Sequence, residues 1–213
     1  MSQPRQARAI RTREKIIRAA AEVFDESGFA GASMNKIVRR AETTMGAMYF
    51  HFASKEEVAQ TVMAEQASDM AFPAGEDGLQ RMLDITLEVA RQLRTNVLLR
   101  AGVRLAVEQG SFGMSDAAPY QLWSEMLRTQ LVAAERRGEL LPGVDIEEFA
   151  EIVVGAYTGT QLLSSIATGH ADVYERVATL WRYMLPAVAA PEVIAGLDLG
   201  VADSARKGAS LGS

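Results

Sequence analysis

The sequence has no cysteine and only two histidines, and these shortages exclude most catalytic and metal chemistry. Without thiols the chain forms no disulfide, no thiolate zinc site and no cysteine nucleophile. His51 and His170 lie far apart in the sequence, so we expect neither a catalytic triad nor a two-histidine metal site. A glycine-rich phosphate loop is also missing. We therefore expect a protein that is not an enzyme and that uses no metal and no cofactor.

Long apolar runs are missing too. No run approaches the length of a helix that crosses a bilayer, and the start, MSQPRQARAIRTREK, lacks the apolar core of a secretory signal. The 213 residues, 48% hydrophobic and 23% charged, have the composition of a soluble globular protein with one large domain or two small ones. We expect it to remain in the cytoplasm, with no membrane partner.

Charge is distributed unevenly along the chain. Residues 1–55 contain ten Lys or Arg and five Asp or Glu, a net of +5, whereas residues 56–213 contain twelve and twenty-two, a net of −10. A basic segment on an acidic body suits phosphate binding, because the body repels nucleic acid and orients its approach. An ordinary solvated surface, the alternative, would not favour one end of the chain. The charges therefore indicate a DNA-binding head at the N-terminus.

Residues 33–55, SMNKIVRRAETTMGAMYFHFASK, have the pattern of a helix-turn-helix. Ser33 can cap a first helix, Ser33–Ala41, through its hydroxyl, and this helix has one apolar stripe at positions 34, 37, 38 and 41. A tight turn leads to a second helix, Thr44–Phe50, with a small inner face. In such a motif the second helix enters the DNA major groove.

The remaining segments also predict helices, with no strand-like alternation and no internal repeat. Ser54 and Glu57 form a capping box. Gly28 ends the first amphipathic helix, and Pro4 predicts a flexible arm over residues 1–9. A loop is expected between Gln109 and Pro119. The further predicted helices are Ser54–Ala71, Glu76–Leu93, one beginning at Asn96, Tyr120–Arg137, Ile146–Thr168, Tyr174–Leu185 and a short turn at Pro191–Leu197.

After Glu151 the helix predicted over Ile146–Thr168 is nearly free of charge. A helix that is apolar or small on all sides is covered on all sides. This suggests a partner chain on one side and a cavity on the other. A buried central helix in a monomer is the alternative.

The chain resembles the TetR family of bacterial transcriptional repressors. The residues that carry the resemblance are Arg13–Gly28, the spacer to Ala32, the paired helices, Gly46–Phe52 and Ser54–Glu57. The Tyr-Phe-His-Phe sequence at 49–52, with Leu98–Ala106 and Trp123, is most like the gamma-butyrolactone receptor branch of Streptomyces. The resemblance implies an all-α fold: a three-helix DNA-binding head at residues 1–53, a ligand-binding and dimerisation body at 54–187, and a flexible tail at 188–213.

The resemblance, together with the outer face of the motif, predicts the DNA contacts. Tyr49 and His51 match family residues that grip the backbone, and the two threonines open the recognition helix. Arg5 and Arg8 either reach DNA or belong to a solvated terminus. The predicted DNA-binding residues are Arg5, Arg8, Asn35, Lys36, Thr43, Thr44, Met45, Tyr49, His51 and Lys55.

Two positions depart from the family pattern. Most relatives have Gly in the turn and Lys before the Gly-Ala pair, where this chain has Glu42 and Met45. A residue other than glycine in a left-handed turn costs about 1 kcal/mol, and losing one lysine removes about one phosphate contact. We expect weaker DNA binding or an altered operator.

Trp123 lies where gamma-butyrolactone receptors present a tryptophan to their ligand, and polar groups interrupt otherwise apolar faces. A mostly apolar cleft with few donors suits a small lactone or furan, although Trp123 can also be core packing, and Thr158 and Gln161 can also bond across a dimer interface. The predicted ligand-binding residues are Gln66, Leu83, Leu87, Trp123, Met126, Thr158, Gln161 and Leu162.

The resemblance thus implies a homodimeric repressor of secondary metabolism that binds a pseudo-palindromic DNA operator and is released by a small lipophilic, gamma-butyrolactone-like ligand. The last two large helices would form its four-helix dimer core. One alternative is a repressor of an efflux or catabolic operon with another ligand. A second is a ligand-independent pseudo-receptor, which Glu42 and Met45 keep open.

Overall fold

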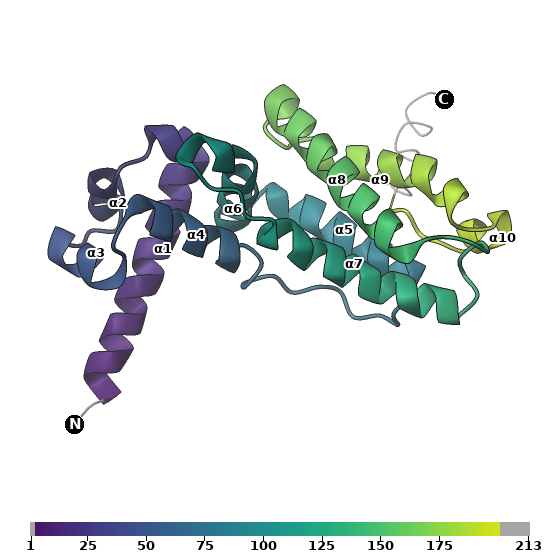
Figure 1. Ribbon diagram of the computed structural model, residues 1–213, viewed down its shortest axis with the longest axis horizontal. Helices are drawn as coiled ribbons and strands as arrows, with labels where there is room; N and C mark the ends of the chain where they lie inside the picture. Colours follow the sequence, from purple (N-terminus) through teal and green to yellow (C-terminus); the bar gives the residue numbers. More distant parts are fainter. Residues whose placement is uncertain (1–2, 201–213) are drawn as a thin grey trace, which may run out of the picture. The chain divides into compact units, whose positions relative to one another are not determined.

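The computed structural model describes residues 3–200, with side chains from residue 6, and this part of the chain is all-helical (Figure 1). It divides into two compact units. The first comprises the chain up to residue 70 and residues 96–119; the second comprises residues 71–95 and the chain from residue 120. The boundary predicted between residues 53 and 54 divides the DNA-binding part from the rest of the chain. The two compact units do not follow this boundary.

The first unit is built around α1, Gln3–Gly31, against which α2, α3, α4 and α6 pack. Ile16 and Phe24 of α1 are fully buried in its core. The other elements of this unit are α2 (Met34–Arg40), α3 (Met45–His51), α4 (Lys55–Glu65), α6 (Val97–Glu108) and η1 (Gln109–Phe112).

Helix α1 begins at Gln3, so our prediction of a flexible arm over residues 1–9 is wrong for the described residues 3–9. Proline is tolerated in the first turn of a helix, because the amide hydrogen that it lacks would have no partner there. The predicted stop at Gly28 is present as a break within α1, with φ 65°. This backbone conformation, with φ 65° and ψ −178°, favours glycine because residues with a Cβ rarely adopt it.

Both helices of the predicted helix-turn-helix are present within one residue of their expected ends. Ser33 caps α2 by accepting a hydrogen bond from the Lys36 amide at 3.2 Å. Ser54 caps α4 in the same way by accepting from the Glu57 amide at 3.2 Å, and the Glu57 carboxylate accepts from the Ala53 amide. The predicted cap by Ser54 is therefore confirmed, and Glu57 reaches back one residue further than in a standard capping box, to the Ala53 amide.

Helix α4 ends at Glu65 and not near Ala71 as predicted. After Glu65 the amides of Ser68 and Met70 bond to carbonyls three residues back, which is a turn pattern. Serine and aspartate favour such turns over a helix interior, because their side chains compete for backbone hydrogen bonds.

The second unit comprises α5 (Leu79–Leu93), most of α7 (Ala118–Arg136), α8 (Ile146–Thr168) and α9 (Val173–Met184), followed by η2 (Leu185–Ala187) and α10 (Pro191–Ala195). Helices α5 and α8 both pack on α9. Helix α7 is linked to the segment before α5 by side chains: Gln130 Oε1 accepts from the Gly78 amide at 3.2 Å. The carboxylate of Glu139 accepts from the Leu79 amide at 2.8 Å. This cap and Gly78, with φ 145°, start α5 three residues later than predicted.

The described part of the predicted tail packs on the second unit. Val188 and Ala189 are buried, and the Val188 carbonyl accepts from the Leu141 amide at 2.8 Å. Gln80 Oε1 accepts from the Asp198 amide at 2.8 Å. The prediction of a flexible tail is therefore wrong for residues 188–200, because apolar residues there cover the core. Residues 201–213 lie outside the described part.

A buried polar contact fixes α9 on α5. Trp181 is fully buried, and its Nε1 donates to Thr86 Oγ1 at 2.8 Å. The hydroxyl of Tyr157 on α8 donates to the Thr86 carbonyl at 3.1 Å, and burial raises the pKa of Tyr157. Thr86 therefore connects three helices.

We expect Thr86→Val to lower the free energy of unfolding by about 1–3 kcal/mol, because the buried indole N–H would lose its acceptor while side-chain volume is kept. Chemical denaturation measures this change. Thr129→Val is the matched control, since the Thr129 hydroxyl is exposed and bonds only within α7, and it should change stability by less than about 0.5 kcal/mol. Equal losses in both variants would contradict the role given to Thr86.

Candidate DNA-binding and ligand-binding sites

Helix α3 presents its outer side to solvent. Tyr49 and Phe50 are 57% and 77% exposed. His51 is half-buried, and its ring meets Phe50 edge-on with centroids 4.9 Å apart. Thr44 Oγ1 accepts from the Ala47 amide at 3.1 Å, so Thr44 caps the start of α3, and its hydroxyl can still donate a hydrogen bond. Exposed aromatic and polar groups on one short helix are suited to contact a DNA groove.

The other predicted DNA-binding residues lie on α1, on α2 and in the turn. Lys36 is exposed, and its Nζ donates to the Gly31 carbonyl at 2.7 Å. The side chain of Arg5, in the first turns of α1, is outside the described part. Exposed or half-buried positions are found for Arg8, Asn35, Thr43 and Met45.

Lys55 has an internal role that the sequence did not indicate. Its Nζ donates to the carbonyls of Phe29 and Ala32 at 2.9 and 3.1 Å and lies 3.9 Å from the centroid of the Phe29 ring. A cation at the carbonyl end of a helix is stabilising there. Lys55 therefore stabilises the end of α1, and only one N–H of its ammonium group is left for the predicted phosphate contact.

Sequence reasoning missed Arg39, which is exposed on α2 three residues after Lys36. No ion pair of Arg39 is present among the described residues. Its neighbour Arg40, in contrast, is held by Glu26 and Glu22 at 2.9 and 2.8 Å. These bonds raise the pKa of Arg40, and the bond from Arg40 lowers that of the Glu26 carboxyl. The spacing of three residues places Lys36 and Arg39, two exposed cations, on one face of α2.

Glu42 takes the left-handed conformation predicted for the turn, with φ 45°. A residue other than glycine pays about 1 kcal/mol or more for that conformation. Its carboxylate is 82% exposed and pairs with Lys15 Nζ of α1 at 3.2 Å. Exposed ion pairs contribute little to stability, so this pair does not offset the backbone strain.

The predicted ligand residues fall in both units. Gln66 belongs to the first, where it is 1% exposed at the end of α4, and its Oε1 has no hydrogen-bond partner within the described chain. Gly102 of α6 accommodates it, since a Cβ there would lie 2.4 Å from Gln66 Cβ. The other seven predicted residues belong to the second unit.

In the second unit three pairs each lie on one face of a helix, as spacings of three and four residues require. Leu83 and Leu87 are buried on α5. Trp123 and Met126 are half-buried on α7. On α8, Gln161 is 5% exposed, and the half-buried Thr158 donates to the Val154 carbonyl at 2.8 Å. Leu162, in contrast, is 41% exposed, on the outer side of α8.

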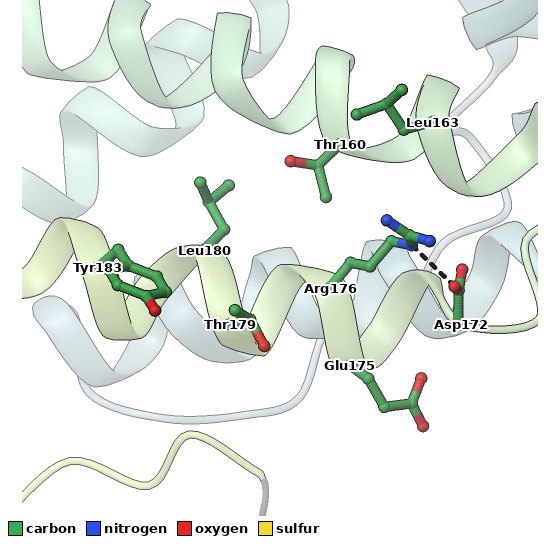
Figure 2. Close-up of a pocket in the computed structure, with 8 residues that line it drawn as sticks. All are labelled: Thr160, Leu163, Asp172, Glu175, Arg176, Thr179, Leu180 and Tyr183. Atoms are coloured by element: carbon green, nitrogen blue, oxygen red, sulfur yellow. Dashed lines mark hydrogen bonds and ion pairs between the residues drawn. The ribbon is translucent and has the colours of Figure 1, made fainter. Parts of the chain in front are cut away.

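A cleft of about 450 Å³ lies between α8 and α9 (Figure 2). Thr160 and Leu163 of α8 lie across from Leu180 and Arg176 of α9, and Arg176 pairs with Asp172 at 2.8 Å. Hydrogen bonds from the hydroxyls of Ser164 and Thr168 lower the pKa of the Asp172 carboxyl to about 2, and the bond from Arg176 makes a smaller contribution. None of the predicted ligand residues lines this cleft.

The outer side of α8 and α9 is strongly apolar. Its large exposed side chains include Leu163 at 61%, Ile166 at 77% and Tyr183 at 82%. Earlier on α8, a Cβ at Gly155 or Gly159 would meet no atom within 4 Å. Single exposed apolar residues are ordinary, but a continuous stripe of them marks an interaction surface.

The geometry of α2 and α3 on α1, joined to a second helical unit, defines a helix-turn-helix DNA-binding protein. Residues 16–62 match the family model of bacterial regulatory proteins of the tetR family, and residues 76–190 match that of the tetracyclin repressor-like C-terminal domain. The chain belongs to the TetR family of bacterial transcriptional regulators, which confirms the resemblance drawn from the sequence.

Similar proteins include the A-factor receptor protein of Streptomyces griseus, 42% identical over 191 residues, 90% of this chain and 68% of that protein. Among solved structures, TylP, a TetR regulator from Streptomyces fradiae, is 41% identical with a TM-score of 0.77, covering 95% of this chain and 96% of that one. A gamma-butyrolactone receptor described as ArpA-like is 28% identical with a TM-score of 0.66, covering 89% and 93%. The predicted likeness to gamma-butyrolactone receptors is thus confirmed.

In residues 3–200 no helix is long and apolar enough to cross a membrane. No group of three or more His, Asp or Glu side chains in that range is placed to hold a metal ion.

We expect Lys55→Met to lower the free energy of unfolding by roughly 1–2 kcal/mol, because two carbonyls at the end of α1 lose their charged donor. Thermal or chemical denaturation measures it. Lys36→Met is the control, since the exposed Lys36 bonds a single carbonyl. If Lys55→Met kept full stability and only weakened DNA binding, Lys55 would be a phosphate contact and not a structural residue.

Proposed function

We propose that this protein is a dimeric repressor that binds a pseudo-palindromic operator and is released from it by a small, mostly apolar signalling molecule of gamma-butyrolactone type. Its targets would be genes of secondary metabolism, in keeping with its similarity to the A-factor receptor. The observation that carries the proposal is the capped helix α3 with its exposed outer side, in a segment, residues 1–55, with a net charge of +5.

Contacts to DNA are assigned to this head. Tyr49 and His51 are proposed to bind the backbone, and Thr43 and Thr44 to reach phosphate or a base edge at the start of α3. Met45 follows in the groove. Asn35, Lys36, Arg8 and Arg5 are proposed as further contacts, to which Arg39 is added because it is exposed and close to Lys36 in the sequence.

The dimer is assigned to the outer side of α8 and α9. A second copy suits this surface because closed two-fold interfaces bring the same patch of both subunits together. The bare backbone at Gly155 and Gly159 allows close helix approach, while Leu163 and Ile166 provide apolar area. Leu162, predicted to bind ligand, is reassigned to this interface because of its exposure.

The ligand is assigned to the second unit, where Leu83, Leu87, Trp123, Met126 and Gln161 are buried or half-buried. Aliphatic and aromatic groups with a few polar atoms suit a lactone with an apolar side chain. Thr158, which bonds its own helix, remains a candidate in this unit. Gln66 is a separate candidate within the first unit, because its buried Oε1 has no partner among the described residues.

Release would follow from geometry. A dimer places two recognition helices in successive major grooves about 34 Å apart. A ligand that prefers a conformation with another spacing lowers DNA affinity by the ratio of its affinities for the two states.

Selecting duplexes from random DNA with the purified protein tests the proposal. A two-fold-symmetric sequence should be recovered, and a synthetic gamma-butyrolactone with an alkyl side chain should release it. Failure to select any sequence would reject the repressor. A selected duplex that no lactone releases would favour the ligand-independent regulator or a repressor with another ligand.

We expect Leu163→Glu to convert the dimer to monomers at micromolar concentration, because each interface would bury two unpaired carboxylates. Analytical ultracentrifugation measures this, with Leu122→Glu as control: Leu122 is 46% exposed on α7, away from the proposed interface. A Leu163→Glu protein that stays dimeric would place the interface elsewhere.

We expect Trp123→Ala to bind the selected duplex like wild type and to need at least about tenfold more lactone for release, a loss of roughly 1.4 kcal/mol in ligand binding. A titration of the DNA complex with lactone measures it. The result against this role would be an unchanged lactone response in a folded variant.

A further inference from the structure

The turn between α2 and α3 contains Glu42, whose carboxylate is not needed for the stability of the turn. Glu42 adopts φ 45°, a conformation that favours glycine or asparagine. Its amide bonds the Arg39 carbonyl at 3.2 Å, which fixes the turn through the backbone and makes no use of the side chain. The side chain is therefore free to serve another purpose.

That side chain holds a cation of the DNA-binding head. Glu42 Oε2 lies 3.2 Å from Lys15 Nζ, and the two side chains are 82% and 53% exposed. Both groups remain open to solvent and to a large ligand such as DNA. While they are paired, Lys15 is not available to neutralise a phosphate.

Glu42 also adds negative charge among the cations of α2. It lines a cleft of about 550 Å³ between α1 and α2 together with Lys36, Arg39 and Arg40. Arg40 is already paired with Glu22 and Glu26. The free positive charge on this side of the head is therefore smaller than its count of basic residues suggests.

The turn leads directly into α3, whose start is capped by Thr44 two residues after Glu42. This is the end of the recognition helix that the proposed function places at the DNA, and like charge there repels phosphate. We propose that Glu42 limits operator affinity, by pairing with Lys15 and by repelling the DNA backbone, so that a weak ligand effect suffices for release. This inference rests on the proposed function.

The size of the effect follows from counterion release. One additional phosphate contact changes the slope of log affinity against log salt by about −0.9, which amounts to about fivefold tighter binding near 0.15 M salt. Glu42→Gln removes the charge and keeps the size of the side chain and the strained backbone, so we expect this fivefold gain and a slope steeper by about 1. Glu42→Asn, with a residue that tolerates the left-handed conformation, should give the same gain.

The test is a double-mutant cycle on the full-length protein, with the duplex that wild type selects from random DNA. In wild type, where Lys15 is paired, Lys15→Gln should change operator affinity by less than about twofold. In the Glu42→Gln background, where Lys15 is released, Lys15→Gln should weaken operator binding about fivefold and so cancel the gain from Glu42→Gln. Glu135→Gln, which removes one exposed carboxylate from α7, is the control for net charge.

Three results would overturn the inference. They are a Glu42→Gln affinity within about twofold of wild type, an equal loss from Lys15→Gln in both backgrounds, and an equal gain from Glu135→Gln. If neither wild type nor Glu42→Gln bound any duplex, the proposed function would fail and this inference with it. A wild type that binds its operator while Glu42→Gln brings no gain would reject the inference alone.

Discussion

The DNA-binding half of the molecule depends on the break in α1 at Gly28. The positive φ there turns the chain, and several backbone groups that the break leaves without helical partners are bonded by side chains. The Phe29 amide donates to Glu108 Oε2 at 2.8 Å, and Arg104 donates to the Asp25 carbonyl at 2.6 Å. Lys55 donates to the Phe29 carbonyl from the other side. Because α2 follows directly, this junction sets the direction of the helix-turn-helix.

The same junction ties α6 to the head. The guanidinium of Arg100 bonds the Asp25 carboxylate at 2.8 Å, and α6 packs along α1 and α4. Gly102 approaches Gln66 so closely that α4 and α6 cannot slide past each other without a clash. Helices α1, α4 and α6 are therefore packed and bonded to one another within the first unit.

Sequence reasoning identified the elements whose signals are local. The predicted helix starts at Ser33, Thr44, Ser54 and Asn96 depend on residues within one turn, and the structure has a side-chain cap at each of them. Errors arose where distant side chains decide the outcome, as at the start of α5, where Glu139 provides the cap from sixty residues away.

The candidate sites follow the same division. The exposure of Tyr49 could be anticipated from its place in the motif, and the resemblance of the chain to the family indicated that Tyr49 contacts DNA. The internal role of Lys55 could not be anticipated, because it requires the fold to bring α4 to the end of α1. Likewise, periodicity alone cannot assign Gln161 and Leu162, neighbours on α8, to the inner and outer sides.

In the proposed function, two basic heads bind one duplex as a pair under the control of a small ligand. This pairing can be measured by titrating the selected operator at several salt concentrations and by sedimenting the complex. We expect an even number of protomers per duplex, affinity that falls by about 0.9 log units per phosphate contact for each tenfold rise in salt, and dissociation on adding the lactone. A single protomer on the duplex, or an affinity that ignores salt, would contradict it.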